Sequence, residues 1–237
     1  MQAVMKYAIF DLDGTLLDYE GVSGEAFDII LKRFGKRFSP ALHSAILGSH
    51  HSFWSKHVLQ ETETDQHMTP DELVHAYHEV VESLFSTMPL MPGAKRLLRT
   101  LKSINVPIAI ATSSASHVVP KKIAFHPIFA ECVDVIVTGD DPLVKNGKPS
   151  PDIFILAAER LGCNANELSK CVVFEDSPFG VLGGIRAGMR TVAIPDTRFL
   201  TEDAIAKHAD IFTHPNVLRV ASLGDVDCHA LFHADRK

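Results

Sequence analysis

The sequence predicts an α/β protein in which a doubly wound parallel sheet forms the core and a small helical domain is inserted into it. Two observations support this fold class. From about residue 91 onward, short apolar runs alternate with helical patterns, as they do when helices cover both faces of a parallel sheet. From about residue 19 to residue 89, helical patterns follow one another without a convincing strand. The helical stretch therefore interrupts the core.

Each predicted strand is a short, mostly apolar run bounded by polar or turn residues. The first run is Tyr7–Phe10. The later runs are Pro107–Ala111, Asp134–Val137, Cys171–Phe174, Thr191–Ile194 and, with a weaker pattern, Ala209–Phe212. The helical patterns among them are Ala94–Ser103, Ser116–Phe125, Asp152–Leu161, Gly180–Ala187 and Glu202–Lys207. Strands and helices that alternate in this way build a Rossmann-like core.

The inserted segment contains four helical patterns. They are Glu25–Phe34, Pro40–Leu47, Ser52–Leu59 and Asp71–Phe85. We assign residues 1–18 and 90–237 to the α/β core and residues 19–89 to a helical cap domain. Both connections between the two parts stand close to the end of the first strand, so we expect the cap to act as a lid that closes over a substrate and excludes water.

Composition limits the classes of partner. The chain has 237 residues and a formal net charge of −6, which argues against nucleic acid because nucleic-acid-binding proteins usually present a basic face. Four widely spaced cysteines show no zinc or redox spacing, so we expect reduced thiols. The sequence shows no signal peptide and no apolar run of about 18 residues that would cross a membrane. We expect a cytoplasmic monomer without a membrane partner.

Two carboxylates directly follow the first strand. Asp11 and Asp13 would lie at the carboxyl end of a parallel strand, which is where open α/β sheets bind ligands. An Asp beside a cation is a nucleophile for phosphoryl transfer, and a second Asp can exchange protons with the leaving group and with water. The alternative is an ordinary turn. A calcium-binding loop is excluded because Val22 stands at the twelfth position, where that loop requires Glu.

Polar groups also follow the next two elements of the core. Thr112 and Ser113 come after the second strand, where hydroxyls and backbone N–H groups at a helix start bind anions, although they could equally be a simple helix cap. Lys148 lies between Gly and Pro in a turn-rich loop and could meet a phosphoryl group as a point charge. The alternative for Lys148 is a solvated loop lysine.

A second acid pair follows the fourth predicted strand. Glu175 and Asp176 stand at the end of an apolar run, and adjacent acids at such a place are costly unless cations or donors face them. They could also cap the helix that follows. Together with the first acid pair they form a cluster of oxygens suited to Mg²⁺. Because four strand ends or loops supply complementary groups, a functional site is favoured over four independent turns and caps.

In these residues the chain resembles the haloacid dehalogenase-like hydrolase superfamily. The four motifs that carry the resemblance are Asp11-Leu12-Asp13-Gly14-Thr15, Thr112-Ser113, Lys148-Pro149 and Glu175-Asp176. The segments LMPGA, GKPSPDIF and VFEDSPFGV are similar to the branch that holds pseudouridine-5′-phosphatase and β-phosphoglucomutase-like phosphatases. The resemblance covers nearly the whole chain, including the position of a helical cap after the first motif.

This resemblance implies a Mg²⁺-dependent phosphatase that hydrolyses a small phosphorylated metabolite: a nucleoside, sugar or polyol monophosphate. Asp11 would attack phosphorus and form an aspartyl-phosphate, and Asp13 would protonate the leaving alcohol and then activate water. The metal would be held by the Asp11 carboxylate, the Asp13 main-chain carbonyl and Asp176, with Glu175 nearby or ligating. The phosphoryl group would be bound by Thr112, Ser113 and Lys148.

Two alternatives remain open. One is a hexose-phosphate mutase of the β-phosphoglucomutase type. Where those mutases carry His and Arg on the first cap helix, this chain has Ser23 and Glu25, and no Arg or Lys stands in the segment 49–52. The other is a non-catalytic relative that only binds a phosphate ligand, which the presence of both Asp11 and Asp13 disfavours. In the cap, His50 or His51 could touch a substrate hydroxyl.

Overall fold

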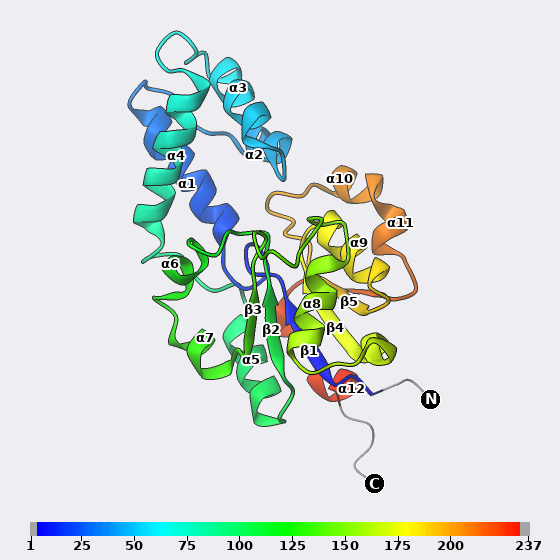
Figure 1. Ribbon diagram of the computed structural model, residues 1–237. Coiled ribbons are helices and arrows are strands. Elements are labelled where there is room, and N and C mark those ends of the chain that lie inside the picture. The colour runs from blue at the N-terminus through cyan, green and yellow to red at the C-terminus, as the bar shows by residue number, and fades with distance from the viewer. Residues whose placement is uncertain (1–3, 233–237) are drawn as a thin grey trace.

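The computed structural model describes residues 4–232 and contains one sheet of six parallel strands (Figure 1). The strands are β1 (Tyr7–Phe10), β2 (Ile108–Ala111), β3 (Val135–Val137), β4 (Cys171–Glu175), β5 (Arg190–Ala193) and β6 (Val217–Arg219). Their order is β3-β2-β1-β4-β5-β6, so β1 and β4 lie at the centre. The predicted α/β, Rossmann-like fold class is confirmed.

Helices cover both faces of this sheet. The helices of the core are α5 (Ala94–Ser103), α6 (Val119–Ile123), α7 (Pro127–Cys132), α8 (Asp152–Arg160), α9 (Pro178–Arg186), α10 (Glu202–Lys207), α11 (Ala209–Phe212) and α12 (Cys228–Phe232), with 3₁₀ turns at Ala165–Lys170 and Leu223–Asp225. Successive strand side chains point to opposite faces. Phe10 accordingly joins the apolar cluster that includes α5 and α7, whereas Ile9 joins the cluster that includes α8.

The weakest strand prediction is wrong. Residues Ala209–Phe212 form the short helix α11, and the sixth strand lies further along, at Val217–Arg219. A run of four residues with three apolar side chains does not distinguish a strand from a helical turn by periodicity. The true strand lies at the edge of the sheet, where Leu218 and Arg219 are exposed, so it lacks the apolar signature of a buried parallel strand.

Another difference concerns the helix expected at Ser116–Phe125. Helix α6 covers only Val119–Ile123, with Pro120 in its first turn, and α7 follows from Pro127. The backbone N–H groups of Ser113 and Ser114 therefore belong to a turn and not to a helix N-terminus. Within that turn, the N–H group of Ser114 donates to Thr112 Oγ1 at 3.1 Å.

Between β1 and α5 the chain forms a group of four helices, here called the helical insert. They are α1 (Tyr19–Lys32), α2 (Pro40–Ile46), α3 (His51–Glu61) and α4 (Pro70–Leu84). Figure 1 shows the helical insert, in blue to cyan, above the sheet. Phe27 stacks on Phe38 and Tyr77, and Trp54 meets the Phe27 ring edge-on. The Phe27, Phe38 and Tyr77 side chains belong to the same apolar cluster as Phe10 of β1, so the apolar core of the insert is continuous with that of the sheet.

The two connections between the helical insert and the sheet lie side by side. The N–H group of Asp18 donates to the Pro89 carbonyl, and that of Met91 donates to the Leu16 carbonyl, both at 2.9 Å. The Asp18 carboxylate caps α1 by accepting from Gly21 N at 3.0 Å. It also accepts two hydrogen bonds from Arg198, at 2.8 and 2.9 Å. The start of the insert is therefore tied to the loop after β5.

The four cysteines are buried and unoxidised thiols. Within residues 4–232, every helix is too short or too polar to span a bilayer.

Asp134 provides a test of the local structure at the start of β2. Its carboxylate accepts from Ile108 N at 2.9 Å and from Lys102 Nζ at 2.8 Å. Although desolvation opposes them, these bonds hold the pKa of Asp134 below its usual value. Replacing Asp134 with Ala should lower the free energy of unfolding by about 1 kcal/mol at pH 7, because the buried Ile108 N–H loses its acceptor.

The pH dependence of this effect has a defined sign. A carboxyl group whose pKa is lower in the folded state stabilises the protein above the unfolded-state pKa of about 4, and the stabilisation is lost as the pH falls further. The difference between the unchanged protein and Asp134→Ala in urea unfolding should therefore shrink at pH 3. Glu131→Ala, which removes an exposed ion pair with Arg99, is the control and should change stability little. An equal effect of Asp134→Ala at both pH values would contradict the assignment.

Candidate active site

The register of the two central strands brings the two acid pairs together. Phe10 of β1 lies opposite Phe174 of β4, and their rings stack at 4.3 Å. The residues that follow in each strand, Asp11 and Glu175, are therefore placed beside each other at the carboxyl end of the sheet. The hydrogen bond from Asp11 N to the Phe174 carbonyl, 2.9 Å long, continues the strand ladder to this point.

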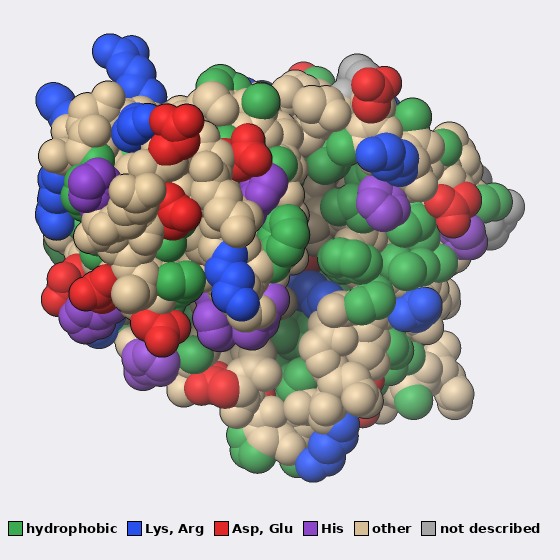
Figure 2. Space-filling view, turned by 90° about the horizontal axis from the view of Figure 1, so that it is seen from above, with side chains coloured by type: hydrophobic (Ala, Val, Ile, Leu, Met, Phe, Trp, Pro, Cys, Tyr) green, Lys and Arg blue, Asp and Glu red, His purple; other side chains and the backbone are tan. Residues whose placement is uncertain are grey.

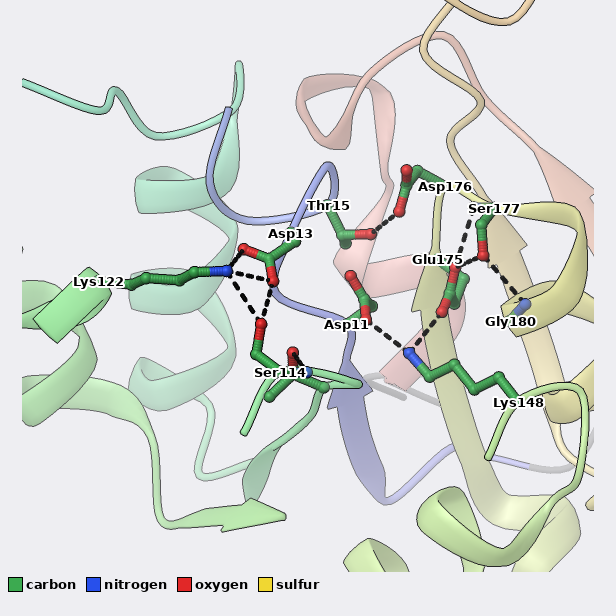
Figure 3. A network of polar contacts seen from close by, with 11 residues as sticks. Asp11, Asp13, Thr15, Ser114, Lys122, Lys148, Glu175, Asp176, Ser177 and Gly180 are labelled. Carbon is green, nitrogen blue, oxygen red and sulfur yellow. Dashed lines mark hydrogen bonds and ion pairs between the residues drawn. The ribbon is translucent and has the colours of Figure 1, made fainter. Parts of the chain in front are cut away.

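Lys148 joins these two acids. Its Nζ donates to Asp11 Oδ1 at 2.5 Å and to Glu175 Oε1 at 2.7 Å (Figure 3). The Lys148 side chain is only 7% exposed, so the solvated-loop alternative is wrong. Burial alone would lower the pKa of Lys148, but the two carboxylates raise it above its ordinary value. The lysine is therefore held as a cation between two carboxylates from different strands.

The inner site carries more negative than positive charge. Asp11, Glu175 and Asp176 supply three carboxylates and Lys148 one ammonium group, which gives a formal net charge of −2. Desolvation raises the pKa of Asp11 to about 7, with Lys148 opposing and Glu175 and Asp13 adding to the shift. Desolvation, Glu175 and Asp11 also raise the pKa of Asp176 well above its ordinary value. A cation bound among these carboxylates would relieve this excess of negative charge.

The donor set fits a hard cation such as Mg²⁺, because carboxylate and carbonyl oxygens are its usual protein ligands. Among residues 4–232, no three Asp, Glu, His or Cys side chains are already gathered as a metal-binding group. Two of the candidate carboxylates are engaged by Lys148, and Asp176 Oδ1 accepts a 2.9 Å hydrogen bond from Thr15 Oγ1. The type of donor atom therefore supports a metal here, although the described side chains do not form a ready coordination sphere.

Two glycines leave space for the acids. Gly14 has a φ of +89°, and a Cβ there would lie 2.3 Å from Asp176 Oδ2. A Cβ on Gly180 would lie 1.7 Å from Glu175 Oε1. The first position requires glycine for its backbone conformation as well as for space. Side chains at these positions would displace the carboxylates that define the site.

Asp13 has a different set of partners. Lys122 Nζ donates to both of its carboxylate oxygens, at 2.8 and 2.7 Å, and Ser114 Oγ donates to Oδ2 at 2.7 Å. Figure 3 shows the Asp13 side chain directed at Lys122 while Asp11 is directed at Lys148. The sequence analysis missed both Lys122 and Ser114. The hydroxyl run Thr112-Ser113-Ser114 was a signal for Ser114, but nothing in the sequence distinguishes Lys122 from its exposed neighbour Lys121.

The predicted hydroxyl residues lie on the same side of the site. Thr112 is buried, and its Oγ1 is occupied by the N–H group of Ser114. Ser113 is exposed and lines the cleft together with Asp11, Asp13 and Lys148. All seven predicted site residues therefore meet at one end of the sheet.

The site opens into a cleft of about 550 Å³ between the core and the helical insert. Its floor contains the acids, Lys148 and Ser113, and its walls include Leu47 of the insert and Phe179 of α9. A second hollow of about 630 Å³ lies under the insert and shares Glu20, Leu47 and Ser113 with the first. Figure 2 looks onto this end of the molecule and shows the surface hollowed between the two lobes.

The chain belongs to the haloacid dehalogenase-like hydrolase family, whose model matches residues 5–188. It is 37% identical over 192 residues to (DL)-glycerol-3-phosphatase 2 of Arabidopsis thaliana, covering 81% of this chain and 80% of that protein. It is 36% identical over 197 residues to a protein of Drosophila melanogaster named "Probable pseudouridine-5′-phosphatase", covering 83% and 84%.

A solved structure supports the fold. The crystal structure of a haloacid dehalogenase-like hydrolase, family IA, variant 3, from Entamoeba histolytica HM-1:IMSS superposes with a TM-score of 0.73. It is 22% identical and covers 96% of this chain and 98% of the other. The predicted family and the predicted enzyme class, a phosphomonoester hydrolase, are confirmed by the family model and the phosphatase relatives.

Removing Lys148 should destabilise the protein. In Lys148→Met, Asp11 and Glu175 lose their shared cation, and breaking a buried ion pair on one side costs about 3 kcal/mol or more. We expect a loss of this size in urea unfolding measured in EDTA. The matched control is Lys145→Met in the same loop, because Lys145 is exposed and its Nζ donates to the Pro142 carbonyl at 2.9 Å. Equal stability of the two variants would show that Lys148 does not neutralise the site.

Proposed function

We propose that this chain hydrolyses a small phosphorylated metabolite with the help of Mg²⁺ and through an aspartyl-phosphate on Asp11. The observation that carries the proposal is the group of three carboxylates that faces one ammonium at the carboxyl end of β1 and β4. Such a site has a nucleophile and too little positive charge of its own, so it suits a phosphate ester that arrives with a divalent cation.

Three residues are proposed to hold the metal: Asp11 and Asp176 through their carboxylates and Asp13 through its main-chain carbonyl. Glu175 would lie nearby or act as a further ligand. When bound, Mg²⁺ supplies positive charge next to the phosphoryl oxygens. Lys148 already places an ammonium group 2.5 Å from Asp11, so it can share the charge of a phosphoryl group bound there. Ser113 and the turn that begins at Thr112 are proposed to bind the remaining phosphoryl oxygens.

The reaction divides between two aspartates. The carboxylate of Asp11 attacks phosphorus, and the bond from phosphorus to the leaving oxygen breaks while Asp13 gives that oxygen a proton. Asp13 then takes a proton from a water molecule, whose oxygen attacks the phosphorus of the aspartyl-phosphate and releases inorganic phosphate. Asp13 lines the same cleft as Asp11, although the two side chains bind different lysines.

The hollow under the helical insert is proposed to receive the alcohol part of the substrate. None of the described residues that line it is Lys or Arg, so it offers no strong site for a second phosphate. Its wall includes Glu20, which shares a 2.9 Å hydrogen bond with the buried His43, together with the exposed imidazole of His50. Such groups suit hydroxyls of a nucleoside, sugar or polyol monophosphate. The lack of Lys and Arg disfavours the mutase alternative.

The names of the relatives agree with this substrate class. Two of them are named for glycerol 3-phosphate and pseudouridine 5′-phosphate, which are monophosphates of neutral, hydroxyl-rich alcohols. We further propose that residues 1–18 and 90–237 act as the catalytic core and residues 19–89 as a cap that covers the cleft. The hydrogen-bonded pair of connections at residues 16–18 and 89–91 would be its hinge.

Phosphate release from a panel of phosphorylated metabolites tests the proposal. The panel should contain glycerol 3-phosphate, pseudouridine 5′-phosphate, other nucleotides and sugar phosphates, each assayed with Mg²⁺ and with EDTA. We expect turnover that requires Mg²⁺ and is lost more than about 1,000-fold in Asp11→Asn, because the amide is not a nucleophile. Asp210→Asn on the exposed surface of α11 is the control. Activity that survives in Asp11→Asn would contradict the assigned nucleophile.

Asp13→Asn tests the proton-transfer role separately. General acid catalysis contributes about 10²–10⁴-fold when the leaving alcohol needs a proton. The variant should therefore lose far more activity with an alkyl phosphate than with 4-nitrophenyl phosphate, whose phenolate leaves without one. The difference is measured in kcat/KM, which reports leaving-group departure and not the hydrolysis of the aspartyl-phosphate that both esters share. A uniform loss would mean that the change disturbs the metal or the geometry of the site.

A further inference from the structure

Lys122 is a buried cation that the proposed reaction does not use. It lies in α6, outside the loop that carries Lys148, and it is only 3% exposed. A lysine is rarely buried without partners, because removing an ammonium group from water is costly. Its hydrogen-bond partners are Asp13, one of the two aspartates of the first motif, and Ser114, which lies in the turn after β2.

The hydrogen bonds of Lys122 occupy all of its donors. An ammonium group has three N–H bonds. Its three acceptors are Asp13 Oδ1 at 2.8 Å, Asp13 Oδ2 at 2.7 Å and Ser114 Oγ at 2.9 Å. No donor is left to bind a phosphoryl oxygen. Lys122 therefore reaches the proposed reacting groups by direct contact through Asp13 and Ser114.

The same contacts restrict the Asp13 carboxylate. Lys122 holds both oxygens, and Ser114 Oγ donates to Oδ2 at 2.7 Å, so rotation of the carboxylate about its Cβ–Cγ bond would break two or three charge-assisted hydrogen bonds. A carboxylate that exchanges a proton with a leaving group has to be held in one orientation relative to it. Ser114 and Lys122 provide that restraint from the core.

The helical insert also contacts Lys122. The ring of Tyr19, at the start of α1, lies 4.0 Å from Lys122 Nζ in a cation–π contact. The Tyr19 hydroxyl shares a 3.3 Å hydrogen bond with Tyr77, whose hydroxyl donates to Ser23 at 2.8 Å. Lys122 is therefore fixed on one side by the carboxylate it binds and on the other by an aromatic ring in the insert.

We propose that Lys122 is a positioning residue. It packs against the Tyr19 ring and, together with Ser114, orients the Asp13 side chain for proton transfer to the leaving oxygen. The proposal rests on the proposed function, because it assigns a supporting residue to the acid–base step. It predicts that Lys122 matters for the departure of poor leaving groups and not for binding of the phosphoryl group.

The test compares leaving groups in matched variants. The unchanged protein, Lys122→Met, Asp13→Asn, the double variant and the control Lys121→Met are assayed with 4-nitrophenyl phosphate and with the alkyl phosphate that the unchanged protein hydrolyses fastest. Lys121 is the exposed neighbour of Lys122, and its ion pair is with Glu82 on the surface. Thermal unfolding of each variant establishes that it is folded. Ser114→Ala, a smaller change, provides a second variant if Lys122→Met does not fold.

We expect the loss of activity in Lys122→Met to depend on the leaving group. In Lys122→Met, kcat/KM for the alkyl phosphate, which reports the first step through departure of the leaving group, should fall by about 100-fold, a typical share of general acid–base catalysis. For 4-nitrophenyl phosphate kcat/KM should fall by less than about threefold, and KM should not rise for either ester. Ser114→Ala should show the same selectivity to a smaller extent. In the Asp13→Asn background, removing Lys122 should have no further effect on the alkyl phosphate, because residues that act through one another are not additive.

Three results would overturn the proposal. They are an equal loss with both esters, a rise in KM with kcat preserved, or a full additional loss in the double variant. If the unchanged protein is active and Asp13→Asn is selective while Lys122→Met and Ser114→Ala are not, only this inference fails. If the unchanged protein releases no phosphate from any ester, the proposed function fails and this inference fails with it.

Discussion

The concentration of carboxylates at the carboxyl ends of β1 and β4 constrains the rest of this structure. Asp11 and Glu175 are placed side by side by the parallel register of the two strands, and Asp176 follows directly. Desolvated carboxylates at this density are unfavourable without cations and donors. Lys148, in the loop before α8, binds Asp11 and Glu175, and Thr15 binds Asp176. The absence of side chains at Gly14 and Gly180 leaves the space that these acids fill.

The two aspartates of the first motif are only two residues apart, yet they have separate electrostatic environments. Asp11 binds Lys148 beside β4, whereas Asp13 binds Lys122 and Ser114 beside α6 and β2. The proposed nucleophile and the proposed proton donor have to behave differently although both are carboxyl groups. Here the difference arises from the elements that surround each side chain.

The helical insert is joined to the core by contacts close to both sides of the cleft. Arg198 in the loop after β5 binds Asp18 at the start of α1, and Ser44 Oγ donates to the Phe199 carbonyl at 2.5 Å. On the other side Tyr19 covers Lys122. The hollow under the insert is thus built from insert residues but opens onto groups that belong to the core. Under the proposed function, the insert supplies most of the surface that would meet the alcohol part of a substrate.

The sequence by itself determined the fold class, the family and the seven residues that the structure gathers at the end of the sheet. These features are local: an apolar strand that ends in acids, hydroxyls or a glycine-bounded lysine can be recognised without knowing its neighbours. The tertiary structure alone decided that Ala209–Phe212 is helical and that an exposed edge strand follows, because four residues carry too little periodicity. It alone also distinguished the buried Lys122 from the exposed Lys121. The reason is that the partner of Lys122, Asp13, lies 109 residues away along the chain, and only packing brings the two charges together.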